Sequence, residues 1–441
     1  MKIIYLLLDA ISYEHSWLSN ENYMPNLKNI TENGINFHNH YSVTHNTRGN
    51  LAAMLYGASS SITGVMGRKQ SFRDSGLKSL QKELNENNFI SAYVGTQPLT
   101  HGEKHGDKLD FDECLYLSPS MSDFYIPAEN FNNILKTKLT QLKDNSLTFF
   151  HYTDCHEPYE TPENILSKKE YPLLHKFHYR LSNILFRIPR KIYRNYFSLK
   201  NLKKKFKVYN EFKYISKLCL NPYGSIKTPE RYSWFYEKVW EDKNYYNEYK
   251  KMMFVTLTYL DKHVGKIINH IKDYHSDNTL IFISSDHGNN GVISPEIKKK
   301  NGLLSKNSTH IPLSVISFDE KLKKKIIHNN KNITNYTSHV NFYKSILHLI
   351  NPKKYNYKNE TIFSKNAINE FVISEINDTR FDFGECVIRK RDKEIHLKVN
   401  KSDNINSLKL IQKKDLINDV PDQDYQIYCD FKKNYNLNFF N

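Results

Sequence analysis

The sequence is poor in cysteine and has no long apolar segment, and both absences narrow the class of protein. Its five cysteines, among 441 residues, include no CxxC pair, and an odd number cannot all pair within one chain. We therefore expect a reducing compartment and no zinc knuckle. The opening MKIIYLLLD has six consecutive apolar residues before Asp9, too few for a signal-peptide core or a membrane span. A buried first strand is expected there instead.

Acidic residues are outnumbered by basic ones, which gives a formal net charge of +16. This excess favours an anionic partner, such as a phosphate-bearing substrate, a lipid surface or a nucleic acid. Hydrophobic residues make up 39% of the chain, enough for a real core. The length allows one large α/β domain with an appendage, or two or three smaller domains.

Short apolar runs alternate with amphipathic stretches along the chain. The runs are KIIYLLL (2–8), FISAYVG (89–95), LTFFHY (147–152), NTLIFISS (278–285) and IPLSVIS (311–317). Continuous apolar strands separated by helices predict an α/β fold, a mostly parallel sheet sandwiched by helices. After about residue 351, FVISEI, CVIRKR and EIHLKV predict a small antiparallel sheet. We expect a catalytic domain over 1–350 and a small α+β subdomain over 351–441.

Residues able to bind a metal or move a proton follow the predicted strands: Asp9, His101, Asp154, His156, Asp286 and His287. In parallel sheets the chemistry collects where the strands end. An Asp–His pair can bind a borderline divalent ion, and the glycine after it allows a tight turn. Alone, Asp286–His287 would more often be a hydrogen-bonded turn. Its pairing with Asp9 at one sheet edge favours a metal site.

The stretch THNTRGNLAAMLYG (44–57) places hydroxyl groups and an arginine before a run of small and apolar residues. A helix beginning near Arg48 would direct free backbone amides at the metal, which suits a phosphate or sulfate oxyanion. A threonine at its N-cap would normally be a structural cap. Here it would also touch the metal, which would lower the pKa of its hydroxyl and make it a nucleophile.

In their order, these motifs resemble the alkaline phosphatase superfamily, specifically its sulfatase-like hydrolases and transferases. The matching segments are LLLDAIS, MPNLKNITENGINFHNHYS, THNTRGNLAAMLYG, DCHEPY, LTYLDKHVG, SSDHG and HIPLSVIS, followed by the small terminal sheet. The resemblance implies one divalent metal ion, held by Asp9, Asp286, His287 and the oxygen of the nucleophile. It also implies a covalent phospho- or sulfo-enzyme.

The resemblance assigns further residues to the substrate. It implies that His156 and His310 contact substrate or assist the leaving group, and that Arg48 neutralises equatorial oxygens. His101 is a weaker candidate of the same kind. Asp154 is a candidate whose alternative role is to fix the loop of His156. Lys306, before His310, is a candidate anion ligand or a solvated lysine.

Two departures from sulfatases bear on the chemistry. True sulfatases convert a cysteine or serine to formylglycine, and threonine cannot be converted in that way. Counting back from Gly57 puts Thr47 at the nucleophile position, whereas counting from Arg48 puts Thr44 there; Thr47 is preferred because it keeps the spacing of the helix. Ala10 follows Asp9 where sulfatases usually have a second carboxylate. The resemblance to phosphoethanolamine and phosphoglycerol transferases therefore favours zinc or manganese over magnesium or calcium.

A basic insertion is expected over about 165–235. From Lys176 to Lys217 it has 13 basic residues and one acidic residue, so 13 − 1 gives +12. Because aromatic and aliphatic residues are interleaved, one side could lie on an anionic membrane surface. The alternative is a solvated helical face. Nucleic acid would use the same residue types, but no nucleic-acid-binding motif accompanies them.

The sequence therefore predicts a metal-dependent transferase that works through a phospho-threonine intermediate. It would move a phosphoethanolamine- or phosphoglycerol-type group from a phosphorylated lipid or activated donor to a glycan or lipid-linked acceptor. A phosphodiesterase, phosphomonoesterase or sulfatase-like hydrolase of the same fold is the nearest alternative. An inactive membrane- or nucleic-acid-binding protein is an alternative of another class. We expect a cytoplasmic location, peripheral to the inner face of the membrane.

Overall fold

The computed structural model describes residues 1–21, 23–65, 76–95, 111–117, 126–156, 159, 242–289, 303–327, 332–364, 371–376, 383–390, 393–400 and 409–412. His101 and the basic insertion lie outside these residues, so what the sequence indicates for them stays a prediction. Among the helices of the described ranges, none combines the length and the apolar character needed to cross a bilayer.

A nine-stranded mixed sheet forms the centre of the described structure, in the order β4-β3-β5-β1-β6-β7-β2-β8, with β9 paired to β2. The strands are β1 (Lys2–Leu8), β2 (Ile35–Tyr41), β3 (Ile90–Gly95), β4 (Glu113–Tyr116), β5 (Ser146–Tyr152), β6 (Thr279–Ser284), β7 (His310–Ser317), β8 (Asn332–Ile333) and β9 (Thr337–Ser338). Of these, β7 runs antiparallel to both of its neighbours, β6 and β2. Its first residue therefore reaches the sheet edge where β1, β5 and β6 end.

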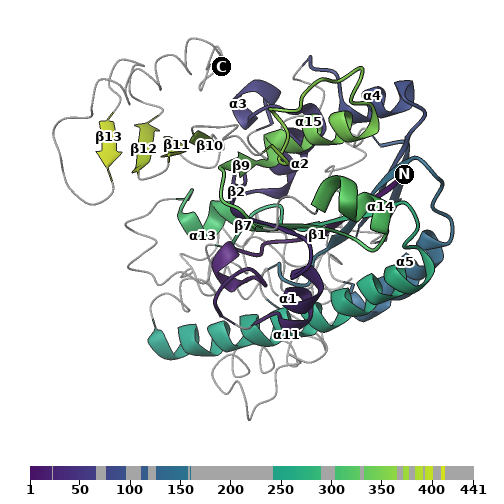
Figure 1. Cartoon of the computed structure of the whole chain (residues 1–441). Coiled ribbons are helices and arrows are strands. Elements are labelled where there is room, and N and C mark those ends of the chain that lie inside the picture. The colour runs from purple at the N-terminus through teal and green to yellow at the C-terminus, as the bar shows by residue number, and fades with distance from the viewer. Residues whose placement is uncertain are drawn as a thin grey trace, which may run out of the picture.

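Helices cover both faces of this sheet, as Figure 1 shows. One face packs against α1 (Pro25–Thr31), α5 (Ala128–Leu139) and the long α11 (Lys243–Tyr274). The other packs against α2 (Thr47–Tyr56), α4 (Leu80–Glu86) and α15 (His339–Ile350). The short helices α3 (Ser60–Thr63), α13 (Lys306–Thr309) and α14 (Glu320–Leu322) lie between these elements. The predicted α/β fold is confirmed.

Strand β1 shows why the central strands are apolar throughout. Its alternate residues Ile4, Leu6 and Leu8 belong to the cluster under α11, whereas Ile3, Tyr5 and Leu7 face the cluster under α2. A strand buried on both sides favours apolar residues at successive positions. Each fully buried residue of this size contributes about 1.5–3 kcal/mol to stability.

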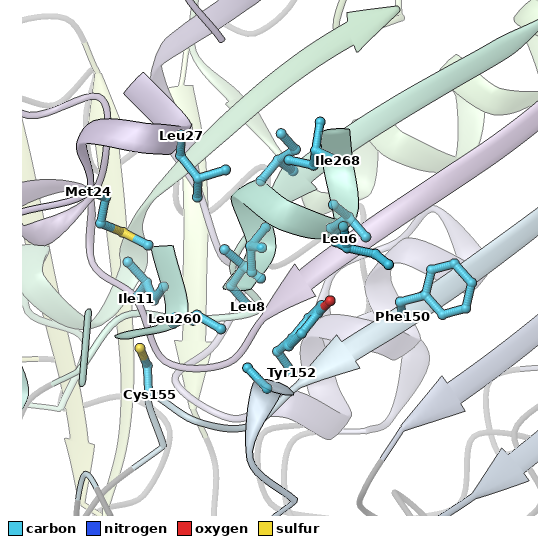
Figure 2. Packing of buried hydrophobic residues seen from close by; sticks show 14 of the residues in the cluster. Leu6, Leu8, Ile11, Met24, Leu27, Phe150, Tyr152, Cys155, Leu260 and Ile268 are labelled. Atoms are coloured by element: carbon cyan, nitrogen blue, oxygen red, sulfur yellow. The ribbon is translucent and has the colours of Figure 1, made fainter. Parts of the chain in front are cut away.

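The first cluster continues past the strand ends toward the polar sheet edge. Figure 2 shows Leu8 and Ile11, which flank the first strand exit, close to Tyr152 and Cys155, which flank the exit of β5. All four side chains are buried. Asp9 and Asp154 therefore leave the sheet from closely packed surroundings, which restrict their movement.

A second, four-stranded antiparallel sheet lies near the C-terminus, at the upper left of Figure 1. Its strands are β10 (Phe371–Ile376), β11 (Phe383–Lys390), β12 (Lys393–Asn400) and β13 (Lys409–Gln412). The predicted antiparallel sheet is confirmed over its first three strands, and β13 adds a fourth. The boundary at residue 351 between a catalytic domain and a subdomain stays a prediction.

The second sheet is attached to two loops that approach the edge of the first sheet. The amide of Glu375 donates to the Val43 carbonyl (2.7 Å), and the Ser374 hydroxyl donates to the Ser42 carbonyl (2.7 Å). The guanidinium of Arg389 donates to the Leu304 carbonyl (2.7 Å). These bonds fix the chain on its way to Thr47 and the segment just before His310.

Candidate active site

Two buried carboxylates from distant parts of the chain meet at the sheet edge. Asp9 follows β1 and Asp286 follows β6, and both are fully buried. Oδ1 of Asp286 accepts hydrogen bonds from the backbone amides of Ala10 (3.0 Å) and His287 (2.8 Å). Ala10 takes a positive φ of 62° to point its amide that way. Position 10, where sulfatases usually have a second carboxylate, thus contributes a backbone amide that orients Asp286.

His287 presents its Nε2 atom to this pair. Its Nδ1 lies 2.8 Å from the Gly288 carbonyl, which can only accept, so Nδ1 carries the proton and the neutral ring has a lone pair on Nε2. Nε2 lies 3.3 Å from Oδ2 of Asp286 and 3.8 Å from Oδ1 of Asp9. Imidazole in this tautomer is the form that binds metal ions.

Gly288 makes the turn after His287 sterically feasible. A Cβ atom at this position would lie 1.9 Å from the Asn307 carbonyl oxygen and 3.1 Å from Cβ of Ser12. The amide of Gly288 also donates to the Ser308 carbonyl (2.8 Å). The glycine is therefore required by close approach of the backbone, as its place in the motif suggests.

Of the two candidate nucleophiles, Thr47 approaches His287, whereas Thr44 is buried within its own loop. The hydroxyl of Thr47, on the half-buried first residue of α2, is 3.5 Å from Nε2 of His287. Thr44 is fully buried, and its hydroxyl accepts from the side chain of Asn46 (3.2 Å). A substrate can approach the first hydroxyl but has no access to the second.

The expectation of a threonine at the N-cap was wrong, because Asn46 holds that position and its side chain accepts from the amide of Gly49 (2.9 Å). An asparagine at the N-cap satisfies a free amide of the first turn as well as a threonine does. The hydroxyl of Thr47 is therefore not used to cap the helix. Arg48, the second residue of α2, is buried directly beside it.

Asn50 holds the loop that delivers Thr47. Its side-chain oxygen accepts from the amides of Val43 (2.9 Å) and Thr44 (3.2 Å). Its side-chain nitrogen donates to the carbonyls of Thr44 (2.8 Å) and Asn46 (2.9 Å). The buried His339 lies 3.1 Å from this oxygen through Nδ1 and 3.1 Å from the Ser285 carbonyl through Nε2. The nucleophile loop and the Asp286 loop are thus tied together.

His151 is a member of the group that the sequence analysis missed. It is fully buried at the end of β5, and its Nε2 lies 3.4 Å from Oδ2 of Asp9. Its Nδ1 is 2.7 Å from the hydroxyl of Tyr93, on β3. The available signal was a histidine inside the otherwise apolar run LTFFHY. The rule about strand ends does not select it, because it lies within the strand.

The residues present fit a divalent cation. The side chains of Asp9, His151 and Asp286 each offer an atom, and these atoms all lie within 4.8 Å of one another. Both oxygens of Asp9, Oδ2 of Asp286 and Nε2 of His151 are buried without a hydrogen-bond partner among the described residues. Leaving carboxylate oxygens buried and unpaired costs several kcal/mol each, roughly, unless a cation compensates them. With His287, this set can hold one ion.

The electrostatic field at Asp9 is positive. Burial by itself raises the pKa of Asp9, but the imidazoles of His156, His151 and His287 together outweigh burial and hold this pKa below its ordinary value. Asp9 is therefore ionised at neutral pH. His156 is half-buried and follows β5, and its charge lowers the pKa of Asp9.

Two other candidates have structural partners. Asp154 accepts from the amide of Ala128 (2.9 Å) at the start of α5, which supports its alternative role of fixing the loop of His156. Lys306 opens the short helix α13 and acts through charge on His310.

His310 reaches the same sheet edge as the first residue of β7. Its ring stacks between Tyr13 (4.2 Å between ring centroids) and Tyr41 (4.8 Å). Burial lowers the pKa of His310 to about 3, although the hydrogen bond from Nε2 to the His38 carbonyl (2.8 Å) opposes this shift. His310 is therefore neutral at pH 7, with its proton on Nε2 and a lone pair on Nδ1. Nδ1 can therefore accept a hydrogen bond, whereas the proton on Nε2 is engaged by the His38 carbonyl.

Comparisons with known proteins agree with this geometry. Residues 2–352 match the family model described as Sulfatase. No curated protein sequence is similar enough to the chain to count as a relative.

Solved structures with the same fold include two with high coverage of both chains. BT4656, solved in complex with its substrate D-glucosamine-2-N,6-O-disulfate, is 14% identical, with a TM-score of 0.63 over 99% of this chain and 98% of that one. The phosphonate monoester hydrolase SpPMH from Silicibacter pomeroyi is 13% identical, with a TM-score of 0.63 over 99% and 94%. At such identities the likeness shows the fold.

A third similar structure is the C-terminal periplasmic domain of the phosphoethanolamine transferase EptC from Campylobacter jejuni. It is 16% identical, with a TM-score of 0.50 over 83% of this chain and 94% of that domain.

Proposed function

Because the chain belongs to the sulfatase family, we propose that it is a metal-dependent phosphotransferase whose intermediate is a phospho-threonine at Thr47. One observation carries the proposal: the half-buried hydroxyl of Thr47 lies 3.5 Å from Nε2 of His287, beside the unpaired oxygens of Asp9 and Asp286. A nucleophile at the start of a helix, next to a cation site, is suited to attack on a phosphoryl group.

The threonine argues for phosphorus over sulfur. Sulfate ester hydrolysis in this family uses formylglycine, which cannot be made from threonine, as set out above. A phosphate ester of threonine, by contrast, forms on the unmodified side chain. This supports transfer of a phospho-substituent, the type of reaction for which the phosphoethanolamine transferase EptC is named.

The proposed reaction has two displacements at one phosphorus. In the first, a bond forms between Oγ1 of Thr47 and phosphorus while the bond from phosphorus to the donor alcohol breaks. The proton of the threonine hydroxyl is lost to a base, and the departing alcohol takes up a proton. In the second, the acceptor hydroxyl loses its proton, attacks phosphorus and releases Thr47, which is reprotonated.

Asp9, Asp286 and His287, with the oxygen of Thr47, would hold the divalent ion, for which we propose zinc or manganese. When bound, the ion lowers the pKa of the hydroxyl and offsets charge on the phosphoryl oxygens. Arg48, which is buried and follows Thr47 in α2, is proposed to pair with a phosphoryl oxygen. His156 is proposed to protonate the departing alcohol. His310, neutral with a lone pair on Nδ1, is proposed to contact the substrate as a hydrogen-bond acceptor.

For donor and acceptor we propose a phosphorylated lipid or activated donor and a glycan or lipid-linked hydroxyl. The basic insertion over 165–235 is proposed to hold the protein to an anionic membrane from the cytoplasmic side. Flotation with anionic liposomes tests the membrane step: the variant lacking 176–207 should stay in solution while the intact chain floats. Equal flotation would remove the membrane from the proposal.

Mass spectrometry of the protein after brief exposure to donor tests the reaction. With zinc or manganese and a nitrophenyl phosphodiester, we expect an adduct on Thr47 whose decay is accelerated by a glycan acceptor. Thr47→Val should abolish the adduct, and Thr44→Val, which removes a buried hydroxyl, should keep it. An adduct that decays at the same rate without acceptor would identify a hydrolase. Turnover with no adduct on Thr47 would overturn the proposal.

A further inference from the structure

His151 is the one imidazole of the group that no motif accounts for. It is fully buried, and its Nε2 has no hydrogen-bond partner among the described residues. Nε2 lies 3.4 Å from Oδ2 of Asp9, yet the two atoms do not meet hydrogen-bond geometry. A buried polar nitrogen without a partner is costly, and it is tolerated where a ligand or ion satisfies it.

The spacing around His151 matches that of atoms which share one ion. Ligands about 2.0–2.1 Å from a tetrahedral ion lie about 3.3 Å from each other. The separation from His151 Nε2 to Asp9 Oδ2 is 3.4 Å, and that from His287 Nε2 to Asp286 Oδ2 is 3.3 Å. Each of these two nitrogen–oxygen pairs therefore has the spacing of two ligands on one ion, and Asp9, His151 and Asp286 bring atoms within 4.8 Å of one another.

Tyr93 determines which nitrogen of His151 faces Asp9. Its hydroxyl lies 2.7 Å from Nδ1 of His151. This hydroxyl can accept a hydrogen bond from Nδ1–H, and in that tautomer the lone pair of the ring lies on Nε2. Metal-binding histidines are generally held in this way, by an acceptor on the ring nitrogen that faces away from the ion.

We propose that His151 is an additional ligand of the metal ion, that Tyr93 holds it in the binding tautomer, and that the resulting two-imidazole, two-carboxylate set selects zinc, cobalt or manganese over magnesium and calcium. Imidazole nitrogen suits the transition ions, whereas magnesium and calcium take oxygen ligands. The inference rests on the proposed function only in placing an ion at this centre. It requires neither a phosphoryl donor nor a reaction at Thr47.

Metal binding without substrate tests this inference. Protein stripped with a chelator is titrated with Zn²⁺ against a competing fluorescent chelator, and with Co²⁺ while the visible absorption bands are recorded. We expect one ion per chain. His151→Leu should weaken Zn²⁺ binding by about 100-fold or more and change the Co²⁺ bands, because even outer partners of ligands are worth about 10- to 100-fold. Tyr93→Phe should weaken it by about 10-fold.

The matched control is His263→Leu, which removes a different buried imidazole, on α11, whose ring contacts Tyr259. It should bind Zn²⁺ like the unmodified chain. The rise in unfolding temperature on adding Zn²⁺ is a second readout, and His151→Leu should lose most of it while its metal-free form still unfolds cooperatively. If His151→Leu fails to fold, Tyr93→Phe decides the outcome, since its change leaves the ring of His151 in place.

Unchanged Zn²⁺ affinity and unchanged Co²⁺ bands in His151→Leu, or in Tyr93→Phe where that variant decides, would overturn the inference. Tighter binding of Ca²⁺ than of Zn²⁺ to the unmodified chain would overturn its selectivity. Thr47→Val separates this result from the proposed reaction, because it should lose the phospho-adduct altogether while the remaining ligands still bind the ion, with lower affinity. A chain that binds Zn²⁺ through His151 but forms no adduct would contradict the transferase proposal and support this inference.

Discussion

The hydroxyl of Thr47 and Nε2 of His287 lie 3.5 Å apart, although 240 positions separate these residues in the sequence. The sheet brings the two residues together, because β2 and β6 lie on either side of β7 and the loops that follow them lie at the same edge. The distance between the proposed nucleophile and the proposed metal ligand therefore depends on long-range packing.

The first prediction concerns the chemistry at Thr47. Thr47→Ser keeps a hydroxyl on a less restricted side chain, and should lower kcat by about 10-fold, since roughly 1.4 kcal/mol of positioning is lost. Thr47→Val should leave no measurable turnover. Steady-state kinetics with a nitrophenyl phosphodiester provide the measurement. Equal kcat for Thr47→Val and the unmodified protein would exclude Thr47 as the nucleophile.

The second prediction concerns Asn50. Asn50→Ala removes four hydrogen bonds to the loop over 43–46, two of which satisfy buried amides. The free energy of unfolding should fall by about 3 kcal/mol, and kcat should fall as Thr47 loses its fixed position. Denaturant titration gives the first quantity. Asn39→Ala is the control, because its exposed side chain makes a single bond to the Thr334 carbonyl, and its effect should stay within about 0.5 kcal/mol.

The third prediction concerns Gly288. Gly288→Ala places a methyl group 1.9 Å from the Asn307 carbonyl oxygen, a clash that only a backbone shift relieves. We expect a loss of about 3 kcal/mol or more in unfolding free energy and weaker metal binding through the displaced His287. In Gly265→Ala, within α11, the nearest atom lies at 3.1 Å on Asn26, and the change should be within about 1 kcal/mol. Similar losses in both variants would mean that the turn adapts.

The fourth prediction concerns pH. The pKa of His310 is lowered to about 3 by burial, below the ordinary value of about 6.5 that applies to the unfolded chain. Between these values the unfolded state binds one more proton, so stability is complete above pH 6.5 and falls as the pH decreases below it. His310→Phe keeps a ring between Tyr13 and Tyr41 but cannot titrate. Its slope of unfolding free energy against pH between 6 and 4 should be smaller by about 1.4 kcal/mol per unit.

Chemical denaturation at several pH values measures that slope for both proteins. His40 and His339 are buried with lowered pKa values as well, so a slope from these residues should persist in the variant. Parallel curves for the two proteins would show that His310 is not buried in its neutral form.

The strands that the sequence predicts well are those buried on both faces. KIIYLLL matches β1 residue for residue. Three of the other runs differ from the observed strands by one residue at one end, and NTLIFISS differs from β6 by one residue at each end. β2 was seen only as part of a family motif, because INFHNHY has too few apolar residues to be recognised as a buried strand. It lies nearer the edge of the sheet, where polar side chains are tolerated.

The site residues that could be predicted are those with a signal in the local sequence. Asp9 and Asp286–His287 follow apolar runs, and the rule about strand ends brings them together. The contributions of Ala10 and Asn46 were not predictable, because a positive φ and an N-cap depend on how the neighbouring loops pack. His151 was hidden for a different reason: it lies within a strand, where a polar residue is read as an exception to the apolar pattern.

The hydrogen bonds that orient Asp286 come from the main chain, through the amides of Ala10 and His287. Main-chain donors survive any substitution that preserves the local backbone. Position 10 can therefore be redesigned while the neighbouring carboxylate keeps its aim, and asparagine or aspartate, which tolerate a positive φ, are the natural choices. Ala10→Asp would add an oxygen donor beside an intact pair, a direct route to engineering which ions the protein accepts.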